Sequence, residues 1–188
     1  MRNFLQLTSG LHTMPLVLAL AQQPHLWDRH QIRTTAPGTP VAACSDILLR
    51  FQPLADTETA HLATPDPHQS VWYPASATLP QARPLIFECM RLVEGERLGR
   101  VLLTRLPPGG HILPHRDADQ NSHFFNFFHL PLLGSEHTPF RCGDETVVMQ
   151  PGEAWWFNNV EEHELLNQGQ EERLTLIVAI AKACPWQP

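Results

Sequence analysis

His115 and Asp117 are separated by a single residue. In an extended segment, residues two apart point to the same face, so this imidazole and this carboxylate can both reach one cation. His163 can supply a third ligand, because it opens a strand-like run directly after the Asn158–Asn159 turn. Two histidines and one carboxylate form the facial triad of non-haem iron sites and leave three coordination positions open. The trio therefore predicts an Fe(II) site that can also take an organic co-substrate and oxygen.

Arg173 adds a second chemical feature. It lies ten residues after His163 and begins the last strand-like run. A tight turn at residues 167–170 would place the two residues on adjacent strands. A guanidinium can grip a carboxylate in a bidentate fork, which lysine cannot match. A dicarboxylate held by iron at one end and by arginine at the other is how 2-oxoglutarate binds.

Other readings of these residues remain open. A His-x-Asp pair is common by chance in a chain with eleven histidines, and it also fits a turn with an exposed charge pair. Asp119 could replace Asp117 as the carboxylate ligand. We expect His111, His123 and His137 to be turn or surface residues.

The elements that must position these residues lie mostly in the second half of the chain. There, short runs of strand-favouring residues are separated by turns. The runs are 100–106, 123–130, 145–150, 154–157, 162–167 and 173–181. Eighteen prolines and ten glycines also favour many turns and few long helices. This texture predicts a barrel or sandwich.

The first half of the chain has a different texture. Apolar residues at helical spacing near residues 16–21 predict a short covering helix, and residues 84–94 predict a second. Residues 46–51 predict a strand, whereas 34–40 and 53–80 are rich in turn residues and prolines. We expect one oxygenase domain over 1–188. In it, residues 1–98 form a wrapping segment of short helices and strands, and residues 99–182 form the β core.

Several short motifs follow one another in the second half of the chain. They are Leu106-Pro107-Pro108-Gly109, Pro114-His115, His129-Leu130-Pro131, Phe140-Arg141-Cys142, the segment 152–159 (GEAWWFNN), His163, Asn167 and Arg173. In this order and spacing, the stretch 102–180 resembles the aspartyl/asparaginyl β-hydroxylase family of Fe(II)/2-oxoglutarate-dependent oxygenases. Trp27 with residues 46–50 resembles the upstream strand of that family less distinctively.

The resemblance implies a fold and a reaction. The fold would be a double-stranded β-helix, a cupin-like jelly roll, with short N-terminal helices packed on it. The reaction would hydroxylate a C–H bond of a peptide or protein side chain, or of a free amino acid, with release of succinate and CO2. Similar enzymes use ascorbate to keep iron reduced. Because the cofactors carry this chemistry, no catalytic side chain is expected beyond the metal ligands.

The resemblance also assigns residues to the site. His115 and His163 match the metal-binding histidines, and Arg173 matches the arginine that pairs with the far carboxylate of 2-oxoglutarate. Thr104 matches a hydroxyl residue that assists that contact, and His129 matches a histidine beside the co-substrate. The animal enzymes of the family have glycine at the position of Asp117, so here the third ligand is present.

The resemblance is weaker at the substrate. Phe127 stands where many members carry an arginine, and Phe125, Phe127 and His129 alternate onto one face. We therefore expect a more apolar pocket and a primary substrate that is not strongly acidic. Arg141 and Asn158 are further candidates for substrate contact.

Composition limits the partners. The formal net charge of −6 and the lack of a basic run argue against nucleic-acid or acidic-lipid binding. No run approaches the roughly 20 apolar residues of a membrane span. The four cysteines are widely spaced and form no Cys-x-x-Cys pair, as expected for reduced thiols in the cytoplasm. Residues 14–21 are apolar, but His12, Thr13 and Pro15 interrupt a signal-peptide pattern.

An alternative from another functional class is a cupin-like regulatory or structural protein that binds a metal without turning over 2-oxoglutarate. A cupin oxidoreductase without 2-oxoglutarate is a third possibility, although such sites usually add histidine ligands. Arg173 argues against both, because a metal site alone needs no anion-binding arginine.

Overall fold

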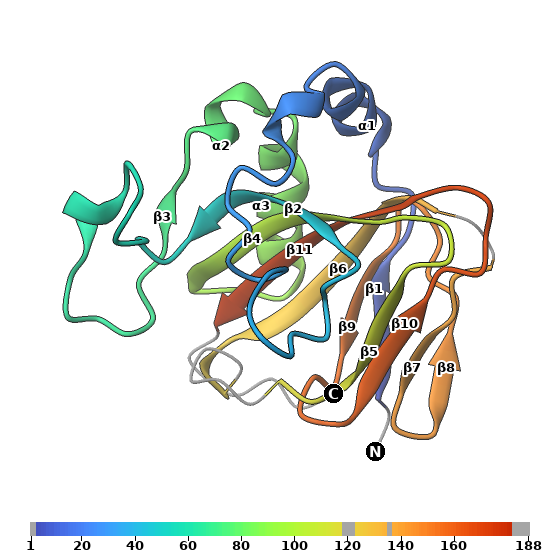
Figure 1. The fold of residues 1–188 in the computed structure, drawn as a ribbon. Coiled ribbons are helices and arrows are strands. Elements are labelled where there is room, and N and C mark those ends of the chain that lie inside the picture. Colours follow the sequence, from blue (N-terminus) through green and yellow to red (C-terminus); the bar gives the residue numbers. More distant parts are fainter. Residues whose placement is uncertain (1–2, 118–122, 135–136, 182–188) are drawn as a thin grey trace.

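Two antiparallel sheets form the core of the protein in a computed structural model that describes residues 3–117, 123–134 and 137–181 (Figure 1). The larger sheet has seven strands in the order β1 (Phe4–Thr8), β9 (Ala154–Phe157), β6 (Asn126–Leu133), β11 (Arg173–Ala181), β4 (Arg97–Leu106), β2 (Ser45–Phe51) and β3 (Val71–Trp72). The smaller sheet has four in the order β5 (His111–His115), β10 (His163–Leu166), β7 (Phe140–Cys142) and β8 (Glu145–Val147).

The chain passes back and forth between these sheets. From β4 to β11, each strand lies in the sheet opposite to its predecessor, except for the β7–β8 hairpin. Leu106 and Phe157 of the larger sheet pack with Phe140 and Leu165 of the smaller one in a single apolar cluster. This connectivity and packing make a double-stranded β-helix, the cupin-like jelly roll. The predicted fold class is confirmed.

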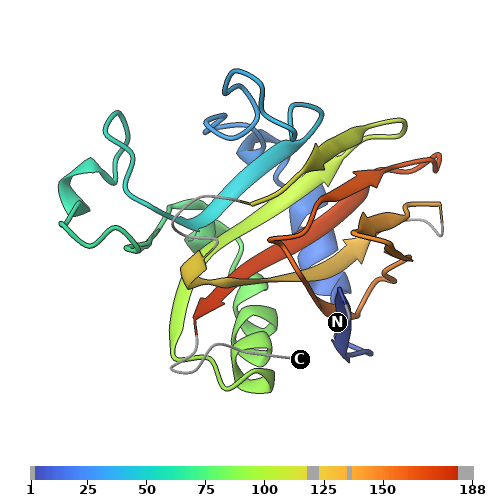
Figure 2. The same cartoon turned by 90° about the horizontal axis from the view of Figure 1, so that it is seen from below.

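Short helices cover the outer face of the larger sheet (Figure 2). They are α1 (Met14–Ala21), α2 (Ala75–Thr78) and α3 (Ala82–Leu92), with single 3₁₀ turns η1 (Pro24–Leu26) and η2 (Ala60–Leu62) elsewhere in the N-terminal half. In α1, Pro15 stands in the first turn, where its missing N–H costs no hydrogen bond. Leu16 and Leu20 follow one turn apart, and both are buried against the sheet. Both predicted helices are present.

The N-terminal half extends the larger sheet at both edges. β1 pairs with β9, and β2 pairs with β4. The sequence predicted β2, but it did not predict β1, β3, β5 or β7 as strands. These four strands have five residues or fewer, and Pro114 interrupts β5. A short strand leaves too few alternating positions for periodicity to detect. β6 begins at Asn126, three residues later than predicted.

The expectation that His163 and Arg173 lie on adjacent strands is wrong. β10 pairs with β5 and β7, whereas β11 pairs with β4 and β6 in the other sheet. Asn167 does not open a hairpin turn. Its N–H donates to the carbonyl of Gly110 at 2.9 Å, and its side-chain amide donates to that of Leu106 at 3.1 Å. These bonds guide the chain from the smaller sheet to the larger one, so the two residues lie on opposite walls of the barrel.

The packing between helices and sheet gives a direct test of this arrangement. Leu103 on β4 is fully buried in the cluster beneath the helices. Leu103→Ala should lower the free energy of unfolding by about 2–5 kcal/mol, because it removes buried methyl groups and leaves a cavity. Urea unfolding would measure this loss. Leu18→Ala on the exposed face of α1 is the control and should change stability by less than about 0.5 kcal/mol. Equal effects would contradict the assigned packing.

Candidate metal centre and cavity

His115, Asp117 and His163 come together at the end of the smaller sheet. His115 ends β5, His163 begins β10, and the two are paired in the antiparallel register. One potential ligand atom from each of the three residues lies within 4.8 Å of the others. His115 Nε2 is 3.7 Å from Asp117 Oδ1. Among the described residues, this is the one group of at least three His, Cys, Asp or Glu side chains arranged to hold a metal ion.

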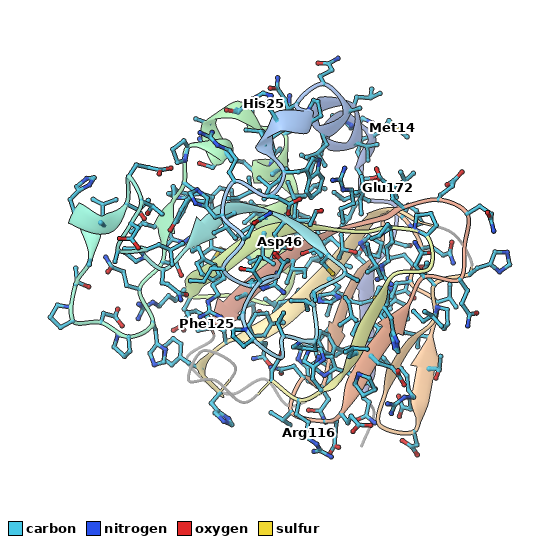
Figure 3. The ribbon with its side chains drawn as sticks, viewed as in Figure 1. Met14, His25, Asp46, Arg116, Phe125 and Glu172 are labelled. Carbon is cyan, nitrogen blue, oxygen red and sulfur yellow. The ribbon has the colours of Figure 1, made fainter. Side chains whose placement is uncertain are left out.

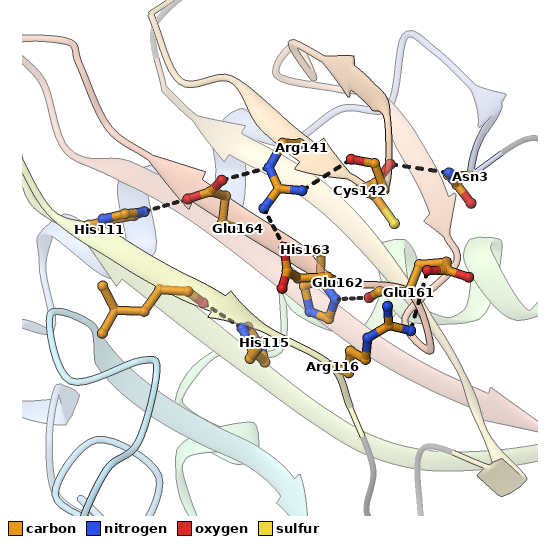
Figure 4. A network of polar contacts seen from close by, with 12 residues as sticks. Asn3, His111, His115, Arg116, Arg141, Cys142, Glu161, Glu162, His163 and Glu164 are labelled. Carbon is orange, nitrogen blue, oxygen red and sulfur yellow. Dashed lines mark hydrogen bonds and ion pairs between the residues drawn. The ribbon is translucent and has the colours of Figure 1, made fainter.

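The hydrogen bonds of the two histidines fix their tautomers. His115 Nδ1 lies 2.7 Å from the carbonyl oxygen of Leu113, and His163 Nδ1 lies 3.0 Å from that of Glu161 (Figure 4). A carbonyl can only accept, so each Nδ1 carries the proton. Each Nε2 is then left with a lone pair, as metal-binding histidines require. Burial lowers the pKa of His163, which also favours the neutral ring.

Asn159 supports the carboxylate of this trio. Its side-chain amide donates to Asp117 Oδ2 at 3.4 Å, and its carbonyl accepts the N–H of Asp117 at 3.0 Å. The 158–161 turn that places it is the one predicted from the two asparagines. The sequence offered Asn158 as a candidate for substrate contact, since spacing alone does not show which of the two asparagines faces inward.

A cavity of about 440 Å³ opens beside the trio and is large enough for a small-molecule ligand. The smaller sheet contributes His115 and His163 to its wall, and the segment just after β5 contributes Asp117. The larger sheet contributes Leu102, Ile177 and His129, which are neighbours across β4, β11 and β6. The trio therefore faces a row of mainly apolar side chains across the barrel.

Arg173 is enclosed in the barrel and is not among the residues that line the cavity. It is 3% exposed, and its Nε donates to Thr175 Oγ1 at 3.2 Å. Thr175 is two residues before Ile177 on β11 and therefore shares its face. Nη1 of Arg173 is buried and has no hydrogen-bond partner among the described residues. Burial lowers the pKa of Arg173 to about 10, so the side chain remains a cation at neutral pH.

Thr104 is the cross-strand neighbour of Thr175. Its hydroxyl donates to Asp46 Oδ1 at 2.8 Å, and Asp46 Oδ2 accepts from Arg33 Nη1 at 2.8 Å. In the view of Figure 3, Asp46 on β2 lies near the middle, whereas Arg116 lies at the lower edge. Thr104 lies two residues after Leu102 on the same face of β4 and does not itself line the cavity. Its single proton is already donated to a carboxylate.

His129 faces the cavity between aromatic rings. The ring centroids of Phe140 and Phe157 are 5.4 and 4.9 Å from that of His129. Burial and the nearby Arg173 hold the pKa of His129 well below its usual value, so the ring is neutral. Its Nδ1 is buried without a partner among the described residues. A neutral ring in this position can offer a hydrogen bond to a ligand.

The three candidate substrate residues are placed differently. Phe127 lines the cavity, as expected. Arg141 does not; it is held by Glu164 at 2.6 Å and by Glu162 at 2.9 Å (Figure 4). Asn158 does not line it either, and its amide donates to Asn3 Oδ1 at 3.2 Å.

Sequence reasoning missed the cations of the cavity wall. Arg33, Arg100 and Arg116 all line the cavity, and none of them was predicted as a site residue. Arg100 lies two residues before Leu102 on β4, and alternation alone could have placed it on the inner face. Arg33 comes from a loop far away in sequence and gave no such signal.

The remaining candidates lie elsewhere. His111 Nε2 is 2.9 Å from Glu164 Oε2. His123 and His137 are exposed, and Asp119 and Cys184 fall outside the described residues. Cys44, Cys89 and Cys142 are buried free thiols, and burial raises the pKa of both Cys44 and Cys89 to about 12. No helix in the described part of the chain is long and apolar enough to cross a membrane.

Comparisons with known proteins agree with this architecture. Residues 66–183 match the family described as aspartyl/asparaginyl beta-hydroxylase. A search of curated proteins found no match. The fold is similar to an oxidoreductase of the 2OG-Fe(II) oxygenase family from Burkholderia pseudomallei, with a TM-score of 0.52, 11% identity, and coverage of 73% of this chain and 66% of that chain. At this identity, the likeness shows the fold alone.

Two further solved structures are similar to part of this chain. A predicted oxalate decarboxylase from Thermotoga maritima has a TM-score of 0.38 and 21% identity, covering 50% of this chain and 73% of that one. A cupin domain from Bordetella pertussis has a TM-score of 0.36 and 19% identity, covering 46% of this chain and 85% of that one.

Proposed function

Because this chain belongs to the aspartyl/asparaginyl β-hydroxylase family, we propose that it is an Fe(II)- and 2-oxoglutarate-dependent dioxygenase. Family membership supports hydroxylase chemistry of the general kind. The finer assignment is that the enzyme hydroxylates a C–H bond of a peptide side chain or a free amino acid and releases succinate and CO2. The primary substrate would enter the cavity beside His115 and His163.

The observation that carries this proposal is the pairing of two kinds of site in one barrel. His115, Asp117 and His163 offer two neutral imidazoles and one carboxylate, a donor set suited to Fe(II). A divalent ion bound to one carboxylate keeps one positive charge. Arg173 contributes another, with Nη1 lacking a partner among the described residues. A small dicarboxylate would balance both charges.

The protein's own residues would then bind and orient the reactants. Bound Fe(II) and 2-oxoglutarate would together activate O2, the oxidant for the hydroxylation. Arg173 would hold the distal carboxylate, and the neutral ring of His129 could donate to the co-substrate beside it. The apolar side chains of Leu102, Phe127 and Ile177 would keep bulk water from the reacting centre.

The alternative function is metal binding without turnover, as in a regulatory or structural cupin. Arg173 disfavours it. A buried charge without an ionic partner costs several kcal/mol, and a purely structural metal site gives no reason to bear that cost.

The wide spacing and burial of Cys44, Cys89 and Cys142 as free thiols support a cytoplasmic location.

The two functions differ in whether succinate is formed. The purified protein, given Fe(II), ascorbate, 2-oxoglutarate and oxygen, should form succinate slowly alone and faster with a suitable substrate. The panel would compare aspartyl peptides, neutral peptides, proline, lysine and hydrophobic amino acids, with His163→Ala as the inactive control. If the wild type binds Fe(II) but forms no succinate above the control with any member, the metal-binding alternative is favoured.

A further inference from the structure

The loop between η1 and β2 carries an arginine into the cavity. We infer that Arg33 is a second guanidinium of the co-substrate's anion site and acts with Arg173 on the distal carboxylate. This inference rests on the proposed function, since it concerns the same co-substrate. Arg33 lines the cavity together with His129 and the candidate metal ligands.

A series of polar residues on neighbouring strands lies between the two arginines. Arg33 Nη1 donates to Asp46 Oδ2, and Thr104 donates to Asp46 Oδ1, each at 2.8 Å. Thr104 is the cross-strand neighbour of Thr175, which accepts the hydrogen bond from Arg173 Nε. Arg33 and Arg173 therefore lie at the two ends of the series Asp46, Thr104 and Thr175, in which Thr104 and Thr175 are strand neighbours and the other links are hydrogen bonds.

The hydrogen bond of Thr104 shows why a second cation is useful. A hydroxyl has one proton, and Thr104 gives its proton to Asp46. In this arrangement Thr104 cannot also donate to a ligand's carboxylate, although the resemblance implies that contact. The guanidinium of Arg33 has five N–H donors, and its hydrogen bond to Asp46 uses one of them. Arg33 can therefore supply the donor that Thr104 lacks.

The charges at this end of the cavity also fit one carboxylate. Arg33 and Asp46 offset each other, while Arg173 has no carboxylate partner among the described residues. The resulting single positive charge matches a single distal carboxylate. Asp46 is 2% exposed, so it can serve as a fixed anchor that orients Arg33.

The loop itself is fixed in this position. Thr39 Oγ1 donates to the carbonyl of Arg33 at 2.7 Å, and the N–H of Leu113 on β5 donates to the carbonyl of Pro40 at 3.0 Å. The second bond joins the loop to the strand that ends at His115. The loop that carries Arg33 is thus fixed beside the strand that supplies His115, and Arg33 lines the cavity from it.

The rival explanation is that Arg33 only neutralises Asp46 and holds the loop. Calorimetric titration of Mn(II)-loaded protein under nitrogen separates the two roles without requiring turnover. The ligands are 2-oxoglutarate and 2-oxobutanoate, which lacks the distal carboxylate. The proteins are the wild type, Arg33→Gln, Arg33→Lys and Arg29→Gln, an exposed position in the same loop outside the cavity.

Arg33→Gln should weaken 2-oxoglutarate binding by about tenfold, a typical effect of losing one charge-assisted contact. Its affinity for 2-oxobutanoate should stay that of the wild type, and Arg29→Gln should match the wild type with both ligands. Arg33→Lys keeps the charge without the fork and should fall in between, which also provides the test if Arg33→Gln does not fold. Equal losses for both ligands, or none for 2-oxoglutarate, would overturn the inference alone. If the wild type does not bind 2-oxoglutarate, the proposed function fails as well.

Discussion

Replacing His163 with alanine should abolish iron binding. The wild type should bind one Fe(II) or Mn(II) per chain, and the variant should fall below about a tenth of that under the same conditions. Loss of a supporting residue behind a metal ligand already costs about 10–100-fold in affinity, and loss of a ligand should cost more. His163 is 4% exposed and directly opposite His115 in the strand register, and the described residues offer no second cluster of this kind.

Metal analysis after dialysis and the electron paramagnetic resonance signal of bound Mn(II) would both measure this loss. His111→Ala is the matched control. It removes a histidine from the same pair of strands, but one that contacts Glu164 and is not part of the trio. Unchanged metal stoichiometry in His163→Ala would sink the ligand assignment, and equal loss in both variants would point to damage of the sheet.

Removing the side chain of Arg173 should weaken the binding of 2-oxoglutarate. Arg173→Ala should raise the apparent Michaelis constant for 2-oxoglutarate by about thirtyfold or more, because a charge-assisted contact in a buried site is worth roughly 2–4 kcal/mol. The turnover number at saturating co-substrate should change much less. An unaltered Michaelis constant would mean that another group holds the distal carboxylate.

Removing the charge of Arg173 should, by contrast, stabilise the folded protein when no co-substrate is bound. The lowered pKa of Arg173, about 10, reflects a folded state that disfavours the charged guanidinium by roughly 3 kcal/mol. Arg173→Met keeps the length of the side chain without the charge, so it should raise the free energy of unfolding in the absence of co-substrate. With Mn(II) present, adding 2-oxoglutarate should further stabilise the wild type but not this variant.

Urea unfolding with and without the ligands would measure both changes, with Arg91→Met on the exposed face of α3 as the control. Lower stability of Arg173→Met without ligands would show that the guanidinium is better satisfied in the free protein than its contacts indicate. A wild type that gains stability from Mn(II) alone, and nothing more from 2-oxoglutarate, would instead favour the metal-binding alternative.

Local pattern in the sequence was sufficient for much of the fold. Apolar residues at helical spacing placed α1, and turn residues with β-favouring runs placed β9 and β11 at their observed bounds. The alternation that puts His115 and Asp117 on one face is likewise a local property of an extended chain. Together with the family's motif order, this was enough to select the trio that the structure brings together. Its role as a ligand set remains a prediction.

Only the tertiary structure decided how these pieces meet. A ten-residue spacing suggested that His163 and Arg173 were hairpin neighbours, whereas the hydrogen bonds of Asn167 send the chain across to the opposite sheet. The sequence likewise did not predict the ion pairs of Arg141 or the position of Arg33 on the cavity wall. The physical reason is that spacing fixes the face on which a side chain points. It does not fix which distant strand or loop will lie against that face.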